Sequence, residues 1–413
     1  MSQDRLAEHA PVAPPAPGTT TWITLLALLS AGWATNHFAA MLPVLAEVAH
    51  ISKPGLDAAF GLYALGLLPS LLLGGGLSDR HGRRPVVVTG LTLAGLGNLV
   101  MLAWSTLPGV TVGRLVVGLG VGMVASAGTA WAADQDETKG AARAGVLLTS
   151  GFAVGPVATA LTAWAVPGRA GAHLAFAVPV VLTAVFALLC LRVTDSGPSR
   201  TAARRAASDT GATPPGPVTD QRRLRPALAA SLPMALWVFA CVTVSMIVLT
   251  ERIDEQYAGP LLPSVAAVLS LGTGVLAQVG MRRVGGWRGL GVVGAALATT
   301  GYVIAGVAGA QVGLATFVVC SVILGCAYGL CLGQGLRDVE RLAPLASRGV
   351  ATGLFYVVSY SGFALPFVLN TYEDSLGASA PMYVLAALAA ITALTRLRQV
   401  TRHEVAADFQ PVR

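Results

Sequence analysis

The stretch LDAAFGLYALGLLPSLLLGGGLSDRHGRRPVVVTGLTLAGLGNLVMLAW, residues 56–104, places two long apolar runs on either side of a charged segment at residues 78–84. An α-helix needs about 20 apolar residues to cross the hydrocarbon core of a bilayer. Each run meets that requirement, and the charged segment between them belongs in water. The stretch therefore predicts two membrane-spanning helices joined by a short polar loop.

The composition of the whole chain agrees with this interpretation. Of its 413 residues, 54% are hydrophobic and 11% are charged, and the mean hydropathy is +0.68. A soluble domain carries roughly 25% charged residues, and disordered chains lack apolar residues, so both classes are excluded. The net charge of +7 does not indicate a nucleic-acid partner, because the 27 Lys and Arg residues lie between apolar runs and form no single patch.

Apolar runs broken by Gly, Pro or charge predict twelve spanning helices. We expect them near Thr21–Val48, Leu56–Leu77, Val86–Trp104, Val110–Ala133, Ala141–Val166, Gly171–Leu191, Pro226–Thr250, Leu261–Met281, Gly289–Val307, Val312–Gly333, Ala346–Leu369 and Ala378–Leu397. The expected class is an all-α polytopic membrane protein.

Two sets of six helices are separated by a segment rich in Pro, Gly, Thr, Ala and Arg, which reads as a flexible linker. The predicted divisions are an N-terminal tail (1–20), a six-helix bundle (21–192), the linker (193–225), a second six-helix bundle (226–397) and a C-terminal tail (398–413). Basic residues gather on the cytosolic side of membrane proteins. With both termini in the cytosol, only Lys53, Arg169 and Arg252 fall outside, which favours this orientation.

A weak internal repeat relates the two sets. LGGGLSDRHGRRP follows the second run and LAQVGMRRVGGWR follows the eighth, so that Arg283 aligns with Arg80 and Gly285 with Gly82. A match at the same place in both sets indicates duplication, which is common in transporters. We therefore expect two bundles related by a pseudo-two-fold axis.

The segment Gly75-Gly-Leu-Ser-Asp79-Arg80-His-Gly82-Arg83-Arg84 resembles the loop signature of the major facilitator superfamily, at the position between the second and third spans that the family requires. The resemblance implies that the Asp faces the start of the eleventh helix, here near Ser347–Val350, and helps to latch the two halves. Gly75 should permit close helix approach and Gly82 a tight turn. Alternatively, these arginines only set the topology.

Two further segments are similar to family motifs. Arg114, Gly118 and Gly122 in the fourth span match an Arg followed by glycines at helical spacing, although Arg114 could instead snorkel to the outer surface. Gly151, Gly155 and Pro156 in the fifth span resemble a motif of the exporting antiporter branch. The family pattern continues to a Gly-Gly pair where this chain has Thr159-Ala160.

The end of the fourth span adds Asp134, which is similar to the acidic partner of the loop arginines in that family. We predict a relay of Asp79, Arg83 and Asp134, and Asp134 is also a candidate for proton coupling. A solvated charge cluster at the membrane surface is the alternative.

A proton carrier is harder to place, because all twenty acidic residues are expected in tails, loops or helix ends. His37, near the middle of the first span, titrates near physiological pH when unperturbed, and Arg114 could act as its electrostatic partner. A structural histidine bonded across helices is the alternative. Four acids near the predicted outer mouth could also accept protons or be ordinary loop charges: Glu47, Asp57, Glu251 and Asp254.

Polar and aromatic residues within the spans outline a candidate substrate cavity, because such residues are costly against lipid. The predicted substrate-binding residues are Trp33, Asn36, Tyr63, Trp237, Gln278, Tyr328, Tyr356 and Tyr360. Any of them could instead hold helices together. A mostly apolar cavity with few charges suits a bulky lipophilic or neutral solute.

These features predict a monomeric transporter of the plasma membrane with the major facilitator fold, which exports a small amphiphilic or drug-like molecule in exchange for protons. A proton-coupled importer or a uniporter of a small metabolite is the alternative. No metal or cofactor motif is present, and neither a Ser/His pair nor paired intramembrane Asp residues suggest an intramembrane enzyme.

Overall fold

A computed structural model describes residues 18–136, 139–193, 217–257, 259, 261–283, 289–344 and 348–401. Within these residues the chain is almost entirely helical, and the strand-like pairing is one isolated bridge between Ile253 and Val312. The tails 1–17 and 402–413 and most of the predicted linker, 194–216, lie outside the described residues. The helix α9 begins at Pro217, inside the segment expected to be linker.

The first half of the chain contributes six membrane-length helices. They are α1 (Thr19–Val48), α2 (Lys53–His81), α3 (Arg83–Ala103), α4 (Leu107–Met123) continued by the π-helical η1 (Val124–Gly128) and α5 (Thr129–Gln135), α6 (Gly140–Ala165) and α7 (Arg169–Leu191).

The second half contributes another six. They are α9 (Pro217–Thr243) continued by the π-helical η2 (Val244–Val248) and α10 (Leu249–Glu251), α11 (Leu262–Arg283), α12 (Leu290–Ala308), α13 (Leu314–Leu342), α14 (Arg348–Tyr360) continued by the 3₁₀-helical η4 (Ser361–Ala364) and α15 (Leu365–Leu376), and α16 (Ser379–Thr401). A short 3₁₀ turn, η3 (Glu255–Tyr257), precedes α11.

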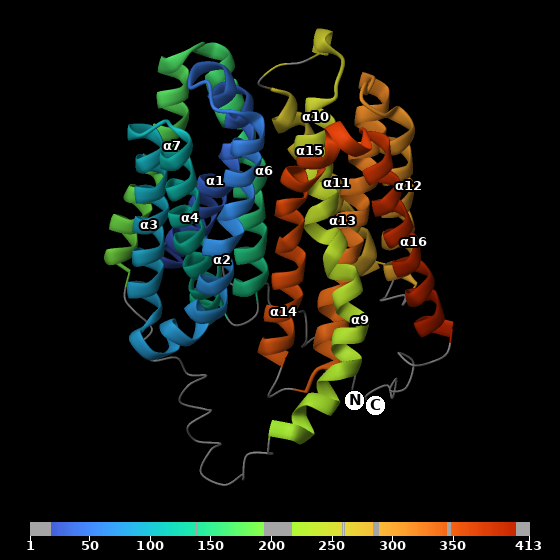
Figure 1. The fold of residues 1–413 in the computed structure, drawn as a ribbon. Coiled ribbons are helices and arrows are strands. Elements are labelled where there is room, and N and C mark those ends of the chain that lie inside the picture. The colour runs from blue at the N-terminus through green and yellow to red at the C-terminus, as the bar shows by residue number, and fades with distance from the viewer. Residues whose placement is uncertain are drawn as a thin grey trace, which may run out of the picture.

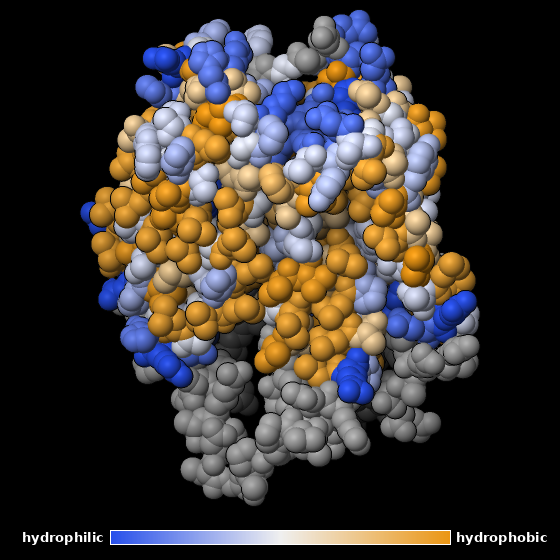
Figure 2. All heavy atoms as spheres, in the orientation of Figure 1, coloured by the Kyte–Doolittle hydropathy of each residue, from blue (hydrophilic) through white to orange (hydrophobic). Residues whose placement is uncertain are grey.

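By length and composition, twelve helices among the described residues can cross a membrane, which confirms the predicted number. They form two six-helix bundles that stand side by side, with α1–α7 in one and α9–α16 in the other (Figure 1). Figure 2 shows hydrophobic side chains over the middle of the molecule and hydrophilic ones above them. The predicted fold class is therefore confirmed.

An even number of spans brings the start of α1 and the end of α16 to the same end of the molecule, which we call the terminal end. The opposite end, formed by the α1–α2 connection, residues 252–257 and the α12–α13 and α15–α16 turns, is the far end (Figure 1). Every helix therefore has a known direction, and α2 runs from the far end to the terminal end.

Local sequence explains where several helices begin. Pro54 and Pro108 lie in the first turn of α2 and α4, where the missing N–H costs no hydrogen bond. Gly82 separates α2 from α3 with φ 94°. A side chain is strained in that conformation, so the tight turn expected at Gly82 is confirmed.

The tenth span is longer than predicted. It was expected to end near Gly333, yet α13 continues to Leu342. The continuation carries Gln334 and Asp338, whose side chains are buried inside the second half. The apolar pattern of the sequence stops at these two polar residues. The helix itself continues past them, and their buried side chains have partners inside the second half.

Candidate functional site

A cavity of about 420 Å³ lies between the two halves. The first half lines it with Thr35, Asn36, Phe60, Tyr63, Leu67, Leu71, Val121, Ala125, Ser126, Thr129, Gly145, Leu148, Thr149 and Phe152. The second half lines it with Phe239, Val242, Thr243, Met246, Leu271, Tyr328, Leu332, Tyr356, Tyr360 and Phe363. The volume is in the range of small-molecule sites.

Among the described residues, the lining contains four Phe and four Tyr and no Asp, Glu, Lys, Arg or His. Ring faces bind apolar and aromatic groups, and the Tyr, Thr and Asn side chains can exchange hydrogen bonds with a few polar groups. The cavity thus suits an uncharged or weakly polar solute with apolar surface.

Five of the eight predicted substrate residues line this cavity: Asn36, Tyr63, Tyr328, Tyr356 and Tyr360. The other three lie elsewhere. Trp237 is buried in the second half, where its Nε1 donates to Thr392 Oγ1 over 3.1 Å, Trp33 packs on Gly155 of α6, and Gln278 lies beside Gly333 of α13. Trp237 thus bonds to another helix of its half, and Trp33 and Gln278 lie against neighbouring helices.

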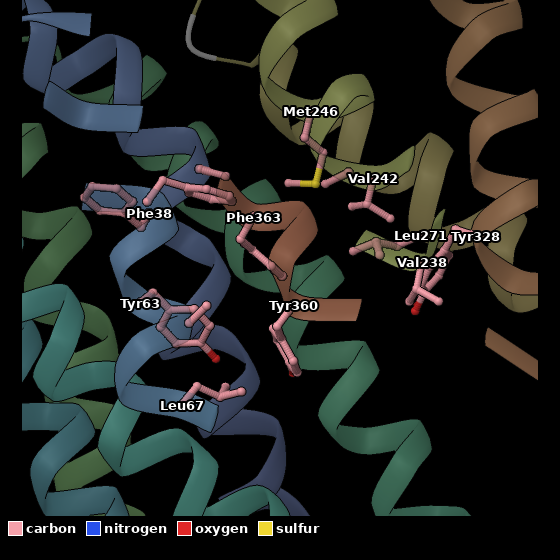
Figure 3. Packing of buried hydrophobic residues seen from close by; sticks show 14 of the residues in the cluster. Phe38, Tyr63, Leu67, Val238, Val242, Met246, Leu271, Tyr328, Tyr360 and Phe363 are labelled. Atoms are coloured by element: carbon pink, nitrogen blue, oxygen red, sulfur yellow. The ribbon is translucent and has the colours of Figure 1, made fainter. Parts of the chain in front are cut away.

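Phe363 joins the two halves at the cavity. Its ring lies 5.2 Å from that of Phe60 on α2 and 4.9 Å from that of Phe239 on α9, measured between centroids. It also stacks on Tyr360 at 5.5 Å. Figure 3 shows Phe363 between Tyr63 on one side and Val242 and Met246 on the other.

Polar contacts close the far end beyond Phe363. Asn370 of α15 donates from Nδ2 to Asp57 Oδ2 of α2 over 2.5 Å and to Glu251 Oε2 of α10 over 3.1 Å. Asp57 is 1% exposed. Across the molecule, Ser264 Oγ of α11 donates to the Pro156 carbonyl of α6 over 2.7 Å. We call the contacts among Asp57, Asn370 and Glu251 the amide bridge.

Charged side chains surround the amide bridge. Lys53 shares a small pocket of about 200 Å³ with Asp57 and Glu251. Arg252 Nη2 lies 3.3 Å from Glu373 Oε1. Burial lowers the pKa of the Arg252 guanidinium, and the neighbouring Glu373 carboxylate opposes that change. Of the four acids predicted near the outer mouth, Asp57 and Glu251 therefore belong to the amide bridge.

At the terminal end, the halves approach where Leu72 of α2 reaches Gly353 of α14. Figure 2 shows a hollow between the two halves in the lower part of the view. The structure therefore shows a conformation whose far end is closed.

His37 and Arg114 lie inside the first half and not on the cavity lining. The His37 ring is fully buried, Nδ1 is 3.2 Å from the Trp33 carbonyl oxygen, and the ring meets Phe176 of α7 edge-on at 5.5 Å. Its Nε2 has no hydrogen-bond partner in the described part of the chain.

Arg114 does not snorkel, because it is 0% exposed. Nη1 donates to the Thr35 carbonyl over 2.9 Å, and the guanidinium lies 4.5 Å from the ring centroids of Phe38 and Tyr63. Carbonyl oxygens and ring faces thus take the place of a carboxylate beside this cation. Since Tyr63 lines the cavity, Arg114 lies one side chain behind the cavity wall.

Arg83 contacts both acids of the predicted relay. Arg83 Nη1 lies 2.8 Å from Asp79 Oδ1, and Arg83 Nε donates to Asp134 Oδ2 over 3.0 Å. Arg83 is 4% exposed. Arg84 Nη1 reaches the carbonyls of Leu191 and Val193 at 3.4 Å, whereas Arg80 is exposed.

Asp79 therefore pairs within its own half. The helix start that it was expected to face begins in the described structure at Arg348, and Ser347 lies outside the described residues. One expectation is wrong: nothing in the described part of the chain lies within 4 Å of the position that a Cβ of Gly75 would occupy, so this glycine mediates no close packing there.

The other motif glycines do pack closely. A methyl group at Gly118 would collide with the Tyr63 carbonyl, and one at Gly122 with Ser70, both on α2. Methyl groups at Gly151 and Gly155 would press on the α1 backbone at Leu29 and Trp33. These glycines bring α2 against α4 and α1 against α6, which places the walls of the cavity.

Sequence reasoning missed the phenylalanines of the cavity and a buried ion pair. Arg396 of α16 pairs with Asp338 of α13 at 2.5 Å, and both side chains are at most 2% exposed. Phenylalanine gives no signal in an apolar run, and Asp338 was assigned to a loop. Among the described residues, no three His, Cys, Asp or Glu side chains are grouped as metal ligands.

Comparison with known proteins adds the family. Residues 24–367 match the family model of the Major Facilitator Superfamily. The chain is 35% identical over 79 residues to the 3-(3-hydroxy-phenyl)propionate transporter of Escherichia coli, which is 19% of each chain. It is 35% identical over 83 residues to the drug efflux pump JefA of Mycobacterium tuberculosis, which is 20% of this chain and 16% of that protein.

These matches span only about a fifth of the relatives' length. Solved structures match this chain over far more of its length. A peptide transporter POT in complex with sulfate superposes with a TM-score of 0.76 at 14% identity, covering 94% of this chain and 95% of that one. A POT family transporter in complex with 5-aminolevulinic acid gives a TM-score of 0.75 at 15% identity, covering 94% and 98%. At such identities the likeness concerns the fold.

Proposed function

The chain belongs to the major facilitator superfamily, and we propose that it is a secondary active transporter, which exports a small amphiphilic or drug-like molecule in exchange for protons by alternating access. The observation that carries this proposal is the ring-lined cavity between the two halves. A site built from both halves changes when the halves move relative to each other, which is how alternating access works.

The cycle needs the far end to open. Opening separates α2 from η4 and α15, so it breaks the Phe60–Phe363 ring contact and the Asp57–Asn370 hydrogen bond. The Ser264–Pro156 hydrogen bond between α11 and α6 breaks as well. These contacts are all non-covalent, which suits an interface that forms and separates in every cycle.

We propose that closing the terminal end uses the loop after α2. In the present conformation, Asp79 and Asp134 both bind Arg83. When the terminal end closes, Asp79 would turn to the start of α14, where the positive end of the helix dipole attracts an anion. Arg83 would then keep Asp134 as its partner. Two alternative partners for one carboxylate give a reversible latch.

The coupling ion is proposed to be the proton, with His37 as its carrier and Arg114 as its electrostatic partner. The unpartnered Nε2 of His37 supports this, since it is free to bind a proton or a water molecule. However, His37 lies behind the cavity wall, and this position argues against its role as the proton carrier. Asp57 and Glu251 are the second pair of candidates, because they lie where the halves separate.

Import or facilitated diffusion of a small metabolite is the second candidate function. It is favoured by the absence of Asp, Glu, Lys, Arg and His among the described residues of the cavity lining, and one partly matching relative is named as a 3-(3-hydroxy-phenyl)propionate transporter. The two functions differ in the direction of movement and in its dependence on a proton gradient.

The remaining assignments are part of the same proposal. The protein is proposed to act as a monomer in the plasma membrane, with both termini in the cytosol, which makes the far end the outer face. The predicted bundles 21–192 and 226–397 would be the two rigid bodies that move.

The experiment is a transport screen of the full-length protein in liposomes of known orientation. Aromatic amphiphiles are offered with and without an imposed pH gradient. Accumulation that follows the gradient and vanishes with a protonophore supports proton-coupled transport, and its direction separates export from import. Movement that ignores the gradient indicates a uniporter, and the absence of movement for every probe contradicts a transport function.

A further inference from the structure

A proline inside a helix leaves one carbonyl without its usual donor, because proline has no N–H to offer the residue four positions before it. In a membrane that carbonyl cannot be left unbonded in hydrocarbon, so side chains from neighbouring helices satisfy it. The helices of this chain contain several such prolines, and three of the freed carbonyls receive a side-chain donor in the described structure.

The first donor lies in the first half. Pro156 of α6 frees the carbonyl of Phe152, and Asn36 of α1 donates to it from Nδ2 over 2.7 Å. Asn36 and Phe152 both line the cavity. The bond therefore joins two helices at the cavity wall.

The second donor lies in the second half, at the corresponding pair of helices. Pro366 of α15 has no N–H to offer the carbonyl of Gly362, which accepts instead the Leu365 N–H of the 3₁₀ turn and the Thr243 hydroxyl of α9, the latter over 3.0 Å from Oγ1. The backbone at Gly362 packs closely on Ala240. Like α1 and α6, α9 and the α14–α15 helix are the first and fifth helices of their half, and Thr243 also lines the cavity.

The third donor is away from the cavity. Pro233 of α9 frees the carbonyl of Ala229, and Gln399 of α16 donates to it from Nε2 over 3.2 Å. Neither Gln399 nor Ala229 belongs to the cavity lining. This bond has the same chemistry as the other two in a different place, so it is a matched control.

We propose that Asn36 and Thr243 are an equivalent pair of positioning residues, which clasp the proline-bent helices of the two halves and thereby set two phenylalanine rings on the cavity wall. Phe152 is the residue whose carbonyl Asn36 binds. Phe363 directly follows the residue whose carbonyl Thr243 binds, and its ring closes the far end against Phe60.

The pairing of the two clasps is the reason to assign them a shared role. Any donor can satisfy such a carbonyl, wherever on the helix the carbonyl lies. Here both donors line the cavity, both come from the first helix of the half, and both act on the helix that carries a cavity phenylalanine. The clasp at Thr243 in particular fixes the 3₁₀ turn η4 that presents Phe363.

The test distinguishes two roles of the Thr243 hydroxyl, which are to satisfy the Gly362 carbonyl and to place the Phe363 ring. Thr243→Val keeps the shape and removes the donor, and Pro366→Ala restores a backbone N–H that can reach Gly362. Two readouts are taken on the full-length protein without ligand. One is thermal unfolding in detergent, and the other is the distance between spin labels at Ser52→Cys and Ser375→Cys, exposed on opposite halves at the far end.

We expect Thr243→Val to lower the unfolding temperature and to raise the population with a separated far end about 2- to 12-fold, which is the 0.5–1.5 kcal/mol of an aromatic pair at 1.4 kcal/mol per factor of ten. Adding Pro366→Ala should restore the unfolding temperature and leave the far end separated. Asn36→Leu should likewise lower the unfolding temperature, and adding Pro156→Ala should restore it. Gln399→Ala with Pro233→Ala should change and restore stability with no change in the distance.

If Pro366→Ala restores both readouts, Thr243 only satisfies a carbonyl and the positioning role is wrong. An unchanged distance in Thr243→Val, or an altered distance in Gln399→Ala, also overturns it. The inference rests on the proposed function only in treating far-end opening as a transport step. Since no substrate is used, a failure of transport and a failure of this proposal are distinguishable.

Discussion

Removing the amide bridge should open the far end. In Asn370→Leu the side chain keeps its approximate size and loses both hydrogen bonds, to Asp57 over 2.5 Å and to Glu251 over 3.1 Å. Hydrogen bonds to charged groups contribute about 1.5–3 kcal/mol. Asp57 is 1% exposed when the far end is closed, so the loss destabilises the closed conformation, whereas water replaces the amide once the far end opens.

The bond to Asp57 joins the two halves, whereas Glu251 lies in the same half as Asn370, so loss of the Asp57 bond sets the expected shift of the open-to-closed ratio at about 10- to 100-fold, since 1.4 kcal/mol corresponds to a factor of ten. Spin labels at Ser52→Cys and Ser375→Cys, on opposite halves, report it as a longer distance population. Thr371→Val is the control, because Thr371 is exposed and its hydroxyl bonds to the Phe367 carbonyl of its own helix. An Asn370→Leu protein with the parent distance distribution would refute the role of the bridge.

Three further predictions concern charged and titratable groups. Replacing Arg83 by Met removes charged hydrogen bonds from Asp79 and Asp134, so transport should fall several-fold with expression retained, while Arg80→Met at an exposed position should stay near wild type; equal rates for the two variants would contradict the relay. Arg396→Met leaves Asp338 charged and buried, which should cost about 3–5 kcal/mol of unfolding free energy, and Asp338→Asn in the same chain should recover part of it; additive losses would argue against a direct pair. His37→Gln should abolish gradient-driven accumulation and retain downhill movement, whereas Asp57→Asn with that phenotype would move the proton site to the far end.

The fold could be predicted from the sequence because the bilayer imposes one strong rule. Each span must be long, apolar and helical, so the runs in the sequence located all twelve helices. The breaks within the spans were missed. The 3₁₀ turn at Ser361–Ala364 depends on Pro366 and on the donor from Thr243, and only the proline is visible in the sequence.

The site was predictable only in part, since a membrane helix is apolar on every side and its pattern does not say which side faces the cavity. Tyr63 and Tyr328 do face it, but Trp237 turns into the second half to reach Thr392. His37 likewise turns toward Phe176 of α7. The spacing of Pro156 after Phe152 and of Pro366 after Gly362 was the available signal for the two clasps.

Access to the cavity from both sides of the membrane is the central claim, and one measurement tests it most directly. Thr149 lines the cavity, and Thr149→Cys can be introduced into a chain with Cys326→Ser, which removes the half-buried native thiol. Labelling rates with a membrane-impermeant thiol reagent are then compared in intact cells and inside-out vesicles, with and without a pH gradient. Alternating access predicts labelling from both sides, with rates that the gradient changes in opposite directions. Labelling from one side only, under every condition, would contradict it.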